Sequence, residues 1–167
     1  PQTTAQTKKV YIYDGQRYKQ KVRVNLEFQN TKKSGLGLPL PKGKVRVYKK
    51  DSDGAQEFIG EDQIDHTPAD ETVRVYLGNA FDIVGERKKI SSKKIGSRVR
   101  EDTYQINLRN HKKSKVDIVV MEHFWGDWEI IQKSHAFKRK DAYTAEAVVT
   151  VPEDGEVEID LTVRMKW

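Results

Sequence analysis

The fold class is indicated most clearly by the last stretch of the chain, VEIDLTVRMKW at residues 157–167. Apolar side chains occupy every second position from Val157 to Trp167, and charged or polar side chains fill the positions between them. Successive side chains of a β-strand point to opposite faces of a sheet, so this period of two predicts a long strand with one buried face.

The same alternation recurs along the chain, most clearly at residues 19–28 and more briefly at 45–47, 73–77, 104–108 and 116–120. No segment shows sustained helical spacing, so we expect helix over less than about a tenth of the chain. The side chains predicted to be buried are Val22, Val24, Leu26, Phe28, Ile106, Leu108, Ile159, Leu161 and Val163.

Turn residues separate these runs at Asp14-Gly15, Asp51–Gly54, Gly78-Asn79, Gly96-Ser97 and Asp154-Gly155. This spacing predicts about ten or eleven strands. It is typical of an antiparallel β-sandwich of immunoglobulin or fibronectin-III-like character. The class is therefore all-β.

A weak internal repeat aligns LEFQNTKKS at residues 26–34 with INLRNHKKS at residues 106–114. Duplication would give two pseudo-repeated lobes, residues 1–96 with an N-terminal extension and residues 97–167, packed without a flexible linker. The segment 81–95 would then run from one lobe into the other. Chance reuse of one turn solution is the alternative, since asparagine is a common residue at strand ends and turns.

Composition and motifs exclude several function classes. The 167 residues contain no cysteine, which excludes disulfides, thiolate metal sites and cysteine nucleophiles. No apolar run approaches the ~20 residues of a membrane span. The nucleophile motif Gly-x-Ser-x-Gly and the phosphate-binding glycine loops are absent as well. We expect no catalytic residue and no cofactor.

A dense polar segment at residues 60–71 offers the one candidate metal or interaction site, formed by Glu61, Asp62, Asp65 and His66. Carboxylates with an imidazole are a plausible ligand set for a hard or borderline metal. Their spacing fits no established ligand template, so a strand end followed by a turn, closed by Pro68, is the simpler interpretation.

A basic stretch forms the candidate polyanion patch, which comprises Arg87, Lys88, Lys89, Lys93, Lys94, Arg98 and Arg100. Together with the single acid Glu86 it accounts for the whole net charge of +6. Lysines that protect a sheet edge from pairing are the alternative. Nucleic acid is not expected, because no aromatic residue lies between Glu86 and Arg100 to stack on bases.

The main aromatic cluster is FWGDW at residues 124–128. Alternation predicts that Trp128 and Ile130 point into the core and leaves Trp125 at a turn. An exposed Trp125 could stack on a sugar or anchor a partner, whereas packing in the core or at a sheet edge is the alternative.

Several motifs resemble a known family: GLGLPLP at 35–41, VRVY at 45–48, FIGED at 58–62, IDHTP at 64–68 and LGNAFDIVGER at 77–87. Together they resemble the C-terminal domain of unknown function in bacterial secreted proteins similar to mucoidy inhibitor A. The likeness covers residues 20–120 and continues more loosely to the end. It implies an exported protein of the periplasm or cell envelope, with an upstream N-terminal region as one partner, and it supplies no activity.

Two hypotheses follow. The first is a non-catalytic β-sandwich module of an exported envelope protein, which acts through envelope proteins or an anionic surface polymer. The second is a metal-dependent hydrolase centred on Glu61, Asp62, Asp65 and His66.

Overall fold

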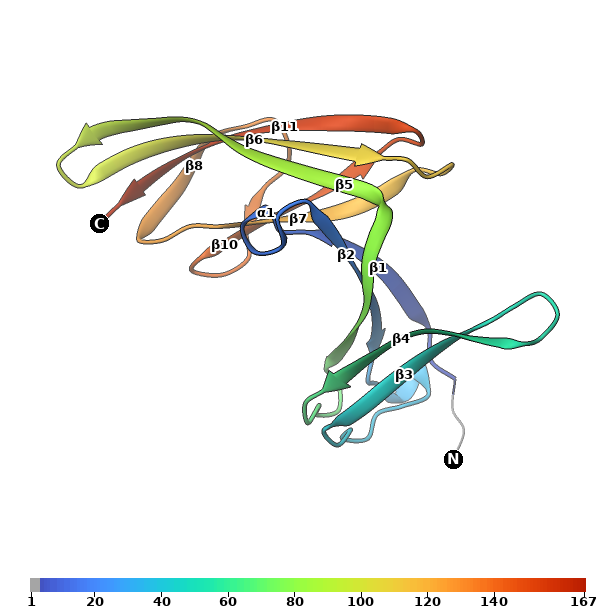
Figure 1. The fold of residues 1–167 in the computed structure, drawn as a ribbon. Coiled ribbons are helices and arrows are strands. Elements are labelled where there is room, and N and C mark those ends of the chain that lie inside the picture. Colours follow the sequence, from blue (N-terminus) through green and yellow to red (C-terminus); the bar gives the residue numbers. More distant parts are fainter. Residues whose placement is uncertain (1–3) are drawn as a thin grey trace. The chain divides into compact units, whose positions relative to one another are not determined.

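The structure, a computed structural model, describes residues 4–167, and its regular elements are almost all strands (Figure 1). Strands make up 66% and helix 4%, which confirms the all-β class and the scarcity of helix. The elements in chain order are β1 (Thr7–Tyr13), α1 (Gly15–Tyr18), β2 (Lys21–Gln29), the 3-10 helix η1 (Lys32–Ser34), β3 (Gly43–Lys50), β4 (Gln56–Ile64), β5 (Thr72–Gly96), β6 (Val99–Asn110), β7 (Val116–His123), β8 (Asp127–Lys133), β9 (Lys138–Arg139), β10 (Thr144–Val151) and β11 (Gly155–Lys166). None of the helices within residues 4–167 is long and apolar enough to cross a membrane.

The strands form a nine-stranded sheet in the order β8-β11-β6-β5-β2-β1-β7-β10-β9 and a separate two-stranded sheet of β3 and β4. The pairs β5–β6, β6–β11, β8–β11 and β7–β10 are antiparallel, but β1 pairs with β7 in parallel. The expectation of a purely antiparallel arrangement is therefore wrong at β1. This strand pairs with a segment more than one hundred residues later, through Tyr11 and Ile118 for example, so no hairpin dictates its direction.

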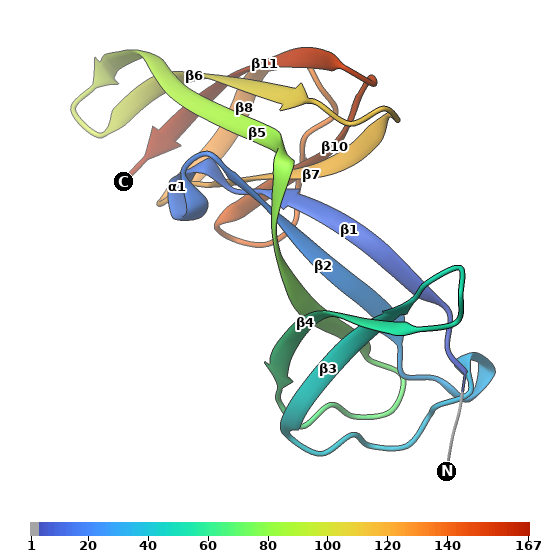
Figure 2. The same cartoon turned by 45° about the vertical axis from the view of Figure 1, so that its right-hand side comes forward.

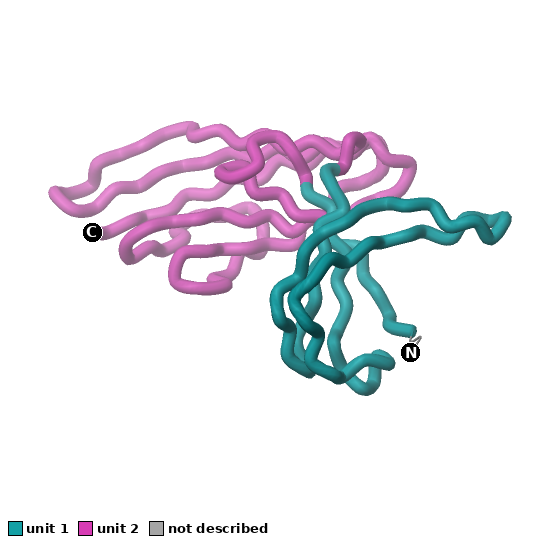
Figure 3. Tube along the Cα trace, turned by 60° about the horizontal axis from the view of Figure 1, so that its bottom comes forward, with its two compact units in different colours: residues 1–10, 23–79 teal, residues 11–22, 80–167 magenta. Residues whose placement is uncertain are grey.

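The chain divides into two compact units, coloured separately in Figure 3. One comprises Pro1–Val10 and Arg23–Asn79, and the other comprises Tyr11–Val22 and Ala80–Trp167. This division differs from the expected boundary between residues 96 and 97, because Gly96 lies in the β5–β6 hairpin within the second unit. Three strands pass between the units: β1 at residues 10–11, β2 at residues 22–23 and β5 at residues 79–80, ahead of the expected segment 81–95.

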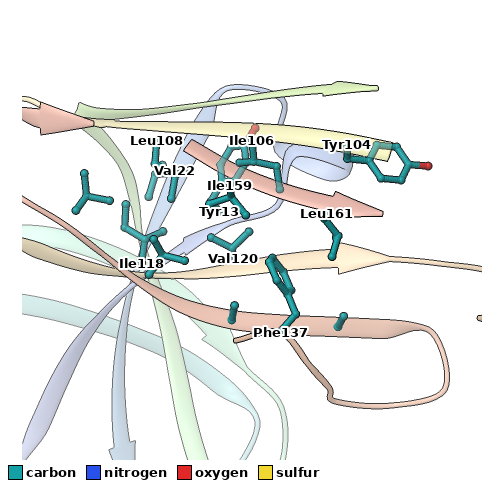
Figure 4. Close-up of a cluster of buried hydrophobic side chains, with 14 of the residues drawn as sticks. Tyr13, Val22, Tyr104, Ile106, Leu108, Ile118, Val120, Phe137, Ile159 and Leu161 are labelled. Atoms are coloured by element: carbon teal, nitrogen blue, oxygen red, sulfur yellow. The ribbon is translucent and has the colours of Figure 1, made fainter. Parts of the chain in front are cut away.

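The core of the second unit is a single apolar cluster to which β5, β6, β7, β10 and β11 contribute (Figure 4). It confirms six of the nine buried side chains predicted from the sequence: Val22, Ile106, Leu108, Ile159, Leu161 and Val163. The alternation on β6 and β11 thus predicts the buried face correctly, because both strands bury one face along most of their length.

The prediction was wrong for the part of β2 that belongs to the first unit. Val24, Leu26 and Phe28 are only partly buried, whereas Asn25 on the opposite face is 5% exposed. The strand leaves the second unit at Val22, so one alternating strand serves two different cores. Among the described residues of the first unit, the buried apolar side chains are Val73 and Val75 of β5.

Two buried asparagines, Asn30 and Asn110, follow β2 and end β6 at the repeated sequence positions. Asn30 Nδ2 donates to the carbonyls of Leu38 and Pro68, and its Oδ1 accepts from the Gly37 amide. Asn110 likewise donates to loop carbonyls and accepts from a loop amide. The shared role explains the repeated motif physically, and duplication stays a prediction.

The apolar loop 35–41 is held down by Asn30 and by the backbone pairing of Leu40 with Thr67. Leu36 and Leu40 are partly buried as a result. Leu38 is the exception, at 73% exposed.

Candidate functional site

The structure places Glu61 on β4 against two cations of β3. Lys44 Nζ lies 2.8 Å and Arg46 Nε 2.7 Å from the carboxylate oxygens of Glu61. Hydrogen bonds from Lys44 and Arg46 lower the pKa of Glu61 below its usual range. This carboxylate is thus part of a cross-strand ion-pair set, which leaves it less available as a metal ligand.

The other three members of the candidate site do not converge on Glu61. Asp62 Oδ2 accepts from the Tyr76 amide at 2.8 Å, and His66 Nδ1 accepts from the Lys42 amide at 3.2 Å. Asp65 lies 3.6 Å from Lys42 Nζ. Alternation along β4 turns neighbouring carboxylates to opposite faces. Over residues 4–167 no three histidine or carboxylate side chains are placed to hold a metal ion together.

The basic stretch lies on β5, on β6 and in the turn between them, and three acidic residues, Glu86, Asp102 and Glu122, pair with about half of its cations. Arg87 binds Glu122, Lys88 binds Glu86, and Lys89 and Arg100 both approach Asp102. Lys93 lies opposite Glu101 in the β5–β6 pairing. The sequence predicted one patch of seven cations, but the fold divides these residues between ion pairs and free positions.

Arg87 is a structural residue. Its guanidinium makes three hydrogen bonds of 2.8–3.0 Å to Glu122, whose side chain is fully buried. The same guanidinium stacks on the Tyr104 ring at 4.0 Å from its centroid. Tyr13 is buried nearby, and burial together with the Glu122 carboxylate raises the pKa of its hydroxyl well above the ordinary value. Arg87 therefore belongs to the interior and is removed from the polyanion patch.

Asp102, also buried, fixes a second set of groups from the stretch. Lys89 Nζ donates at 2.9 Å, Ser92 Oγ at 2.6 Å and the Tyr104 hydroxyl at 3.0 Å. Burial favours the neutral acid, but the hydrogen bonds from Ser92, Lys89 and Tyr104 outweigh it and lower the pKa of Asp102. The folded protein therefore holds this group as a carboxylate.

A pH dependence follows from the lowered pKa of Asp102. As the pH falls below the unfolded-state Asp pKa of about 3.9, Asp102 binds a proton in the unfolded chain but stays ionised in the folded protein, so the free energy of unfolding decreases. Asp102→Asn removes this titration. Its free energy of unfolding, measured in urea across the acidic range, should fall less steeply with decreasing pH than that of the parent. An equally steep decline in the variant would contradict the assignment.

The turn end of the stretch, where Arg100 is paired with Asp102 while Lys94 and Arg98 have no ion pair among the described residues, meets two exposed tryptophans from distant parts of the chain. Figures 1 and 2 show the end of β11 beside the β5–β6 hairpin, and the Trp167 amide donates to the Arg98 carbonyl at 3.1 Å. The Arg100 guanidinium lies 5.4 Å from the Trp125 ring centroid. We define the tip patch by the residues that meet here: Lys94, Arg98, Arg100, Trp125 and Trp167.

Sequence reasoning found the cations of the tip patch and, separately, an exposed Trp125 that could stack on a sugar, but it did not bring the two together and it missed Trp167. It looked for aromatic partners of the cations only between Glu86 and Arg100, whereas Trp125 and Trp167 come from other parts of the chain and their rings lie 5.0 Å apart. Trp128 is buried, as predicted, and Ile130 is partly buried. The signal that could have found the pair is the position of Trp167, which continues the alternating strand beyond its last buried residue, Met165.

A second set that sequence reasoning missed joins Asp14, His123 and Thr144. Asp14 caps α1, where a simple hairpin turn was expected, and its Oδ2 lies 2.7 Å from His123 Nε2. His123 Nδ1 lies 3.2 Å from Thr144 Oγ1, so the order resembles an acid–base–nucleophile relay. Thr144 is buried and not presented to a substrate. The set therefore fastens α1 to β7 and β10, helped by Gln16, whose side chain binds the His123 backbone twice.

Comparison of the chain with protein-family models, with curated proteins and with solved structures found no match.

Proposed function

We propose that this protein is a non-catalytic binding module that holds an anionic partner at the tip patch. The observation that carries the proposal is the meeting of cations and exposed aromatic rings at one place. Lys94 and Arg98 have no ion pair within the described residues, and Trp125 and Trp167 are 44% and 50% exposed. The Trp167 amide donates to the Arg98 carbonyl, and Lys94 lies opposite Arg100, whose guanidinium approaches Trp125. Exposed tryptophans next to guanidinium groups are typical of binding surfaces.

The finer architecture that fits this function is a β-sandwich of immunoglobulin or fibronectin-III-like character. Its support is the placement of the second unit's core between the β5–β6–β11 strands and the β7–β10 strands, as Figure 4 lets the reader follow. Loops and hairpin ends of such modules commonly carry the binding residues. The likeness to the secreted bacterial domain adds a setting, the cell envelope, where anionic polymers are abundant.

Binding at the tip patch should depend on its free cations and on salt. We expect Lys94→Gln/Arg98→Gln to weaken binding of the protein to polygalacturonate and to long-chain polyphosphate roughly tenfold, because two exposed cations contribute up to about 1 kcal/mol each. Physiological salt should weaken parent binding as well, since charges are screened beyond ~8 Å. Calorimetric titration at two ionic strengths measures both effects.

The matched control is Lys49→Gln/Lys50→Gln, which removes the same charge from exposed positions on β3. This control should bind both polymers like the parent. Equal loss in the two double variants would show that net charge alone attracts the polymers, and it would overturn the tip patch as the site.

A further inference from the structure

The two tryptophans of the tip patch form a fixed platform. Gly126 follows Trp125 with a φ of 69°, and a Cβ there would come 2.4 Å from the Lys166 carbonyl oxygen, so the turn packs tightly on the end of β11. Phe124 and Trp128 on either side are buried and in contact with each other, with ring centroids 5.1 Å apart. The backbone that presents Trp125 is therefore held from both sides.

The angle between the two rings discriminates among flat ligands. The planes of Trp125 and Trp167 are inclined by 52° with centroids 5.0 Å apart. Adjacent bases of a single strand stack in parallel on aromatic platforms, so one pair of bases cannot lie flat on both rings. Successive pyranose rings of a polysaccharide are turned relative to each other, and each presents C–H bonds to the electron-rich face of an indole. The inclined pair suits a sugar chain.

The charges around the pair select the kind of sugar. Arg100 lies over Trp125, and Lys94 pairs opposite Arg100 on the neighbouring strand. The Arg98 carbonyl accepts a hydrogen bond from the Trp167 amide, which places the Arg98 backbone beside that of Trp167. Arg100 is already paired with Asp102 at 3.2 Å, so the free cations are Lys94 and Arg98. Cationic side chains bind carboxylates through charge-assisted hydrogen bonds, so a sugar that carries a carboxylate would satisfy these two while its ring covers an indole.

From this geometry we infer that the ligand of the tip patch is an acidic polysaccharide built of uronic acid units, held by stacking on Trp125 and Trp167. The inference rests on the proposed function and adds the ligand class to it. A uronic acid polymer differs from polyphosphate and from single-stranded nucleic acid in combining carboxylates with sugar faces, and the tilted pair can use both.

The test separates stacking from charge in the full chain. Polygalacturonate, polyphosphate and oligothymidylate are titrated against the parent, Trp125→Ala, Trp125→Phe and Phe81→Ala, where Phe81 is a 96% exposed aromatic of the same unit outside the tip patch. Trp125→Ala should weaken polygalacturonate binding at least about tenfold, as truncation of an aromatic anchor does, and leave polyphosphate binding within about twofold. Trp125→Phe should retain most of the affinity, and Phe81→Ala should match the parent.

The outcomes distinguish the ligand class from the underlying function. If Trp125→Ala weakens polyphosphate as strongly as polygalacturonate, or leaves both unchanged, the polysaccharide inference is overturned while an anion site at the tip patch stands. Tighter, Trp125-dependent binding of oligothymidylate would replace the polysaccharide with nucleic acid. If the parent binds none of the three polymers, both the inference and the proposed function fail.

Discussion

Replacing Arg87 by methionine should cost about 3–5 kcal/mol of the free energy of unfolding, the effect of removing one partner from a buried ion pair. Glu122 is fully buried, and its carboxylate has the Arg87 guanidinium as its hydrogen-bonding cation. Methionine keeps most of the apolar volume over Tyr104 but leaves the carboxylate without compensation. Urea unfolding at neutral pH measures the loss.

Two further variants make the Arg87 prediction specific. Lys88→Met changes the adjacent lysine, which is 62% exposed and lies 3.3 Å from Glu86, and should cost less than about 1 kcal/mol. Arg87→Met/Glu122→Met removes both charges and should recover much of the stability, because an apolar pair can replace a buried ion pair. A loss for Arg87→Met no larger than for Lys88→Met would return Arg87 to the polyanion patch.

Gly85→Ala should destabilise the protein by about 1–3 kcal/mol, the usual cost of overpacking a core. A Cβ at this position would lie 2.1 Å from Cε2 of the fully buried Tyr13 ring, and the Gly85 amide is tied to the Gln20 carbonyl. Neither ring nor backbone has room to withdraw. Thermal and urea unfolding should both show the loss.

A double-mutant cycle locates the cause of that loss. In a Tyr13→Ala background the ring is gone, so adding Gly85→Ala should cost far less than it does in the parent. Gly96→Ala is the matched control, since its Cβ would meet nothing closer than 3.9 Å. Equal costs of Gly85→Ala in the two backgrounds would refute the steric explanation.

The sequence predicted the parts of the fold that depend on local patterning. Alternation on β6 and β11 identified their buried faces, since each strand keeps one face toward one core. It failed on β2 beyond Val22, where the strand changes cores and Asn25 becomes the buried residue. It also missed the parallel pairing of β1 with β7, because no hairpin joins strands so distant in the chain.

The sequence predicted only part of the candidate site, because the contacts of the site also join residues that are distant in the chain. Composition located the basic stretch, but it could not show that Arg87 meets Glu122 or that Lys89 meets Asp102, because those contacts form only after folding. The acidic segment 60–71 shows the opposite case, in which residues close in sequence do not come together in the fold. Glu61 is bound by Lys44 and Arg46, whereas His66 accepts a hydrogen bond from the Lys42 amide. Neighbouring side chains along a strand point to opposite faces of the sheet, so residues that are close in sequence do not by that alone form a ligand set.

The central claim is that an anionic ligand binds at the tip patch, and the three tryptophans test it in one spectrum. Trp125 and Trp167 are exposed there, whereas Trp128 is buried with its indole N–H bound to the Ala142 carbonyl at 2.7 Å. When polygalacturonate is titrated into 15N-labelled protein, the indole N–H resonances of Trp125 and Trp167 should shift progressively while that of Trp128 stays in place. Shifts confined to residues outside the tip patch, or three unmoved indole resonances at saturating polymer, would contradict the claim.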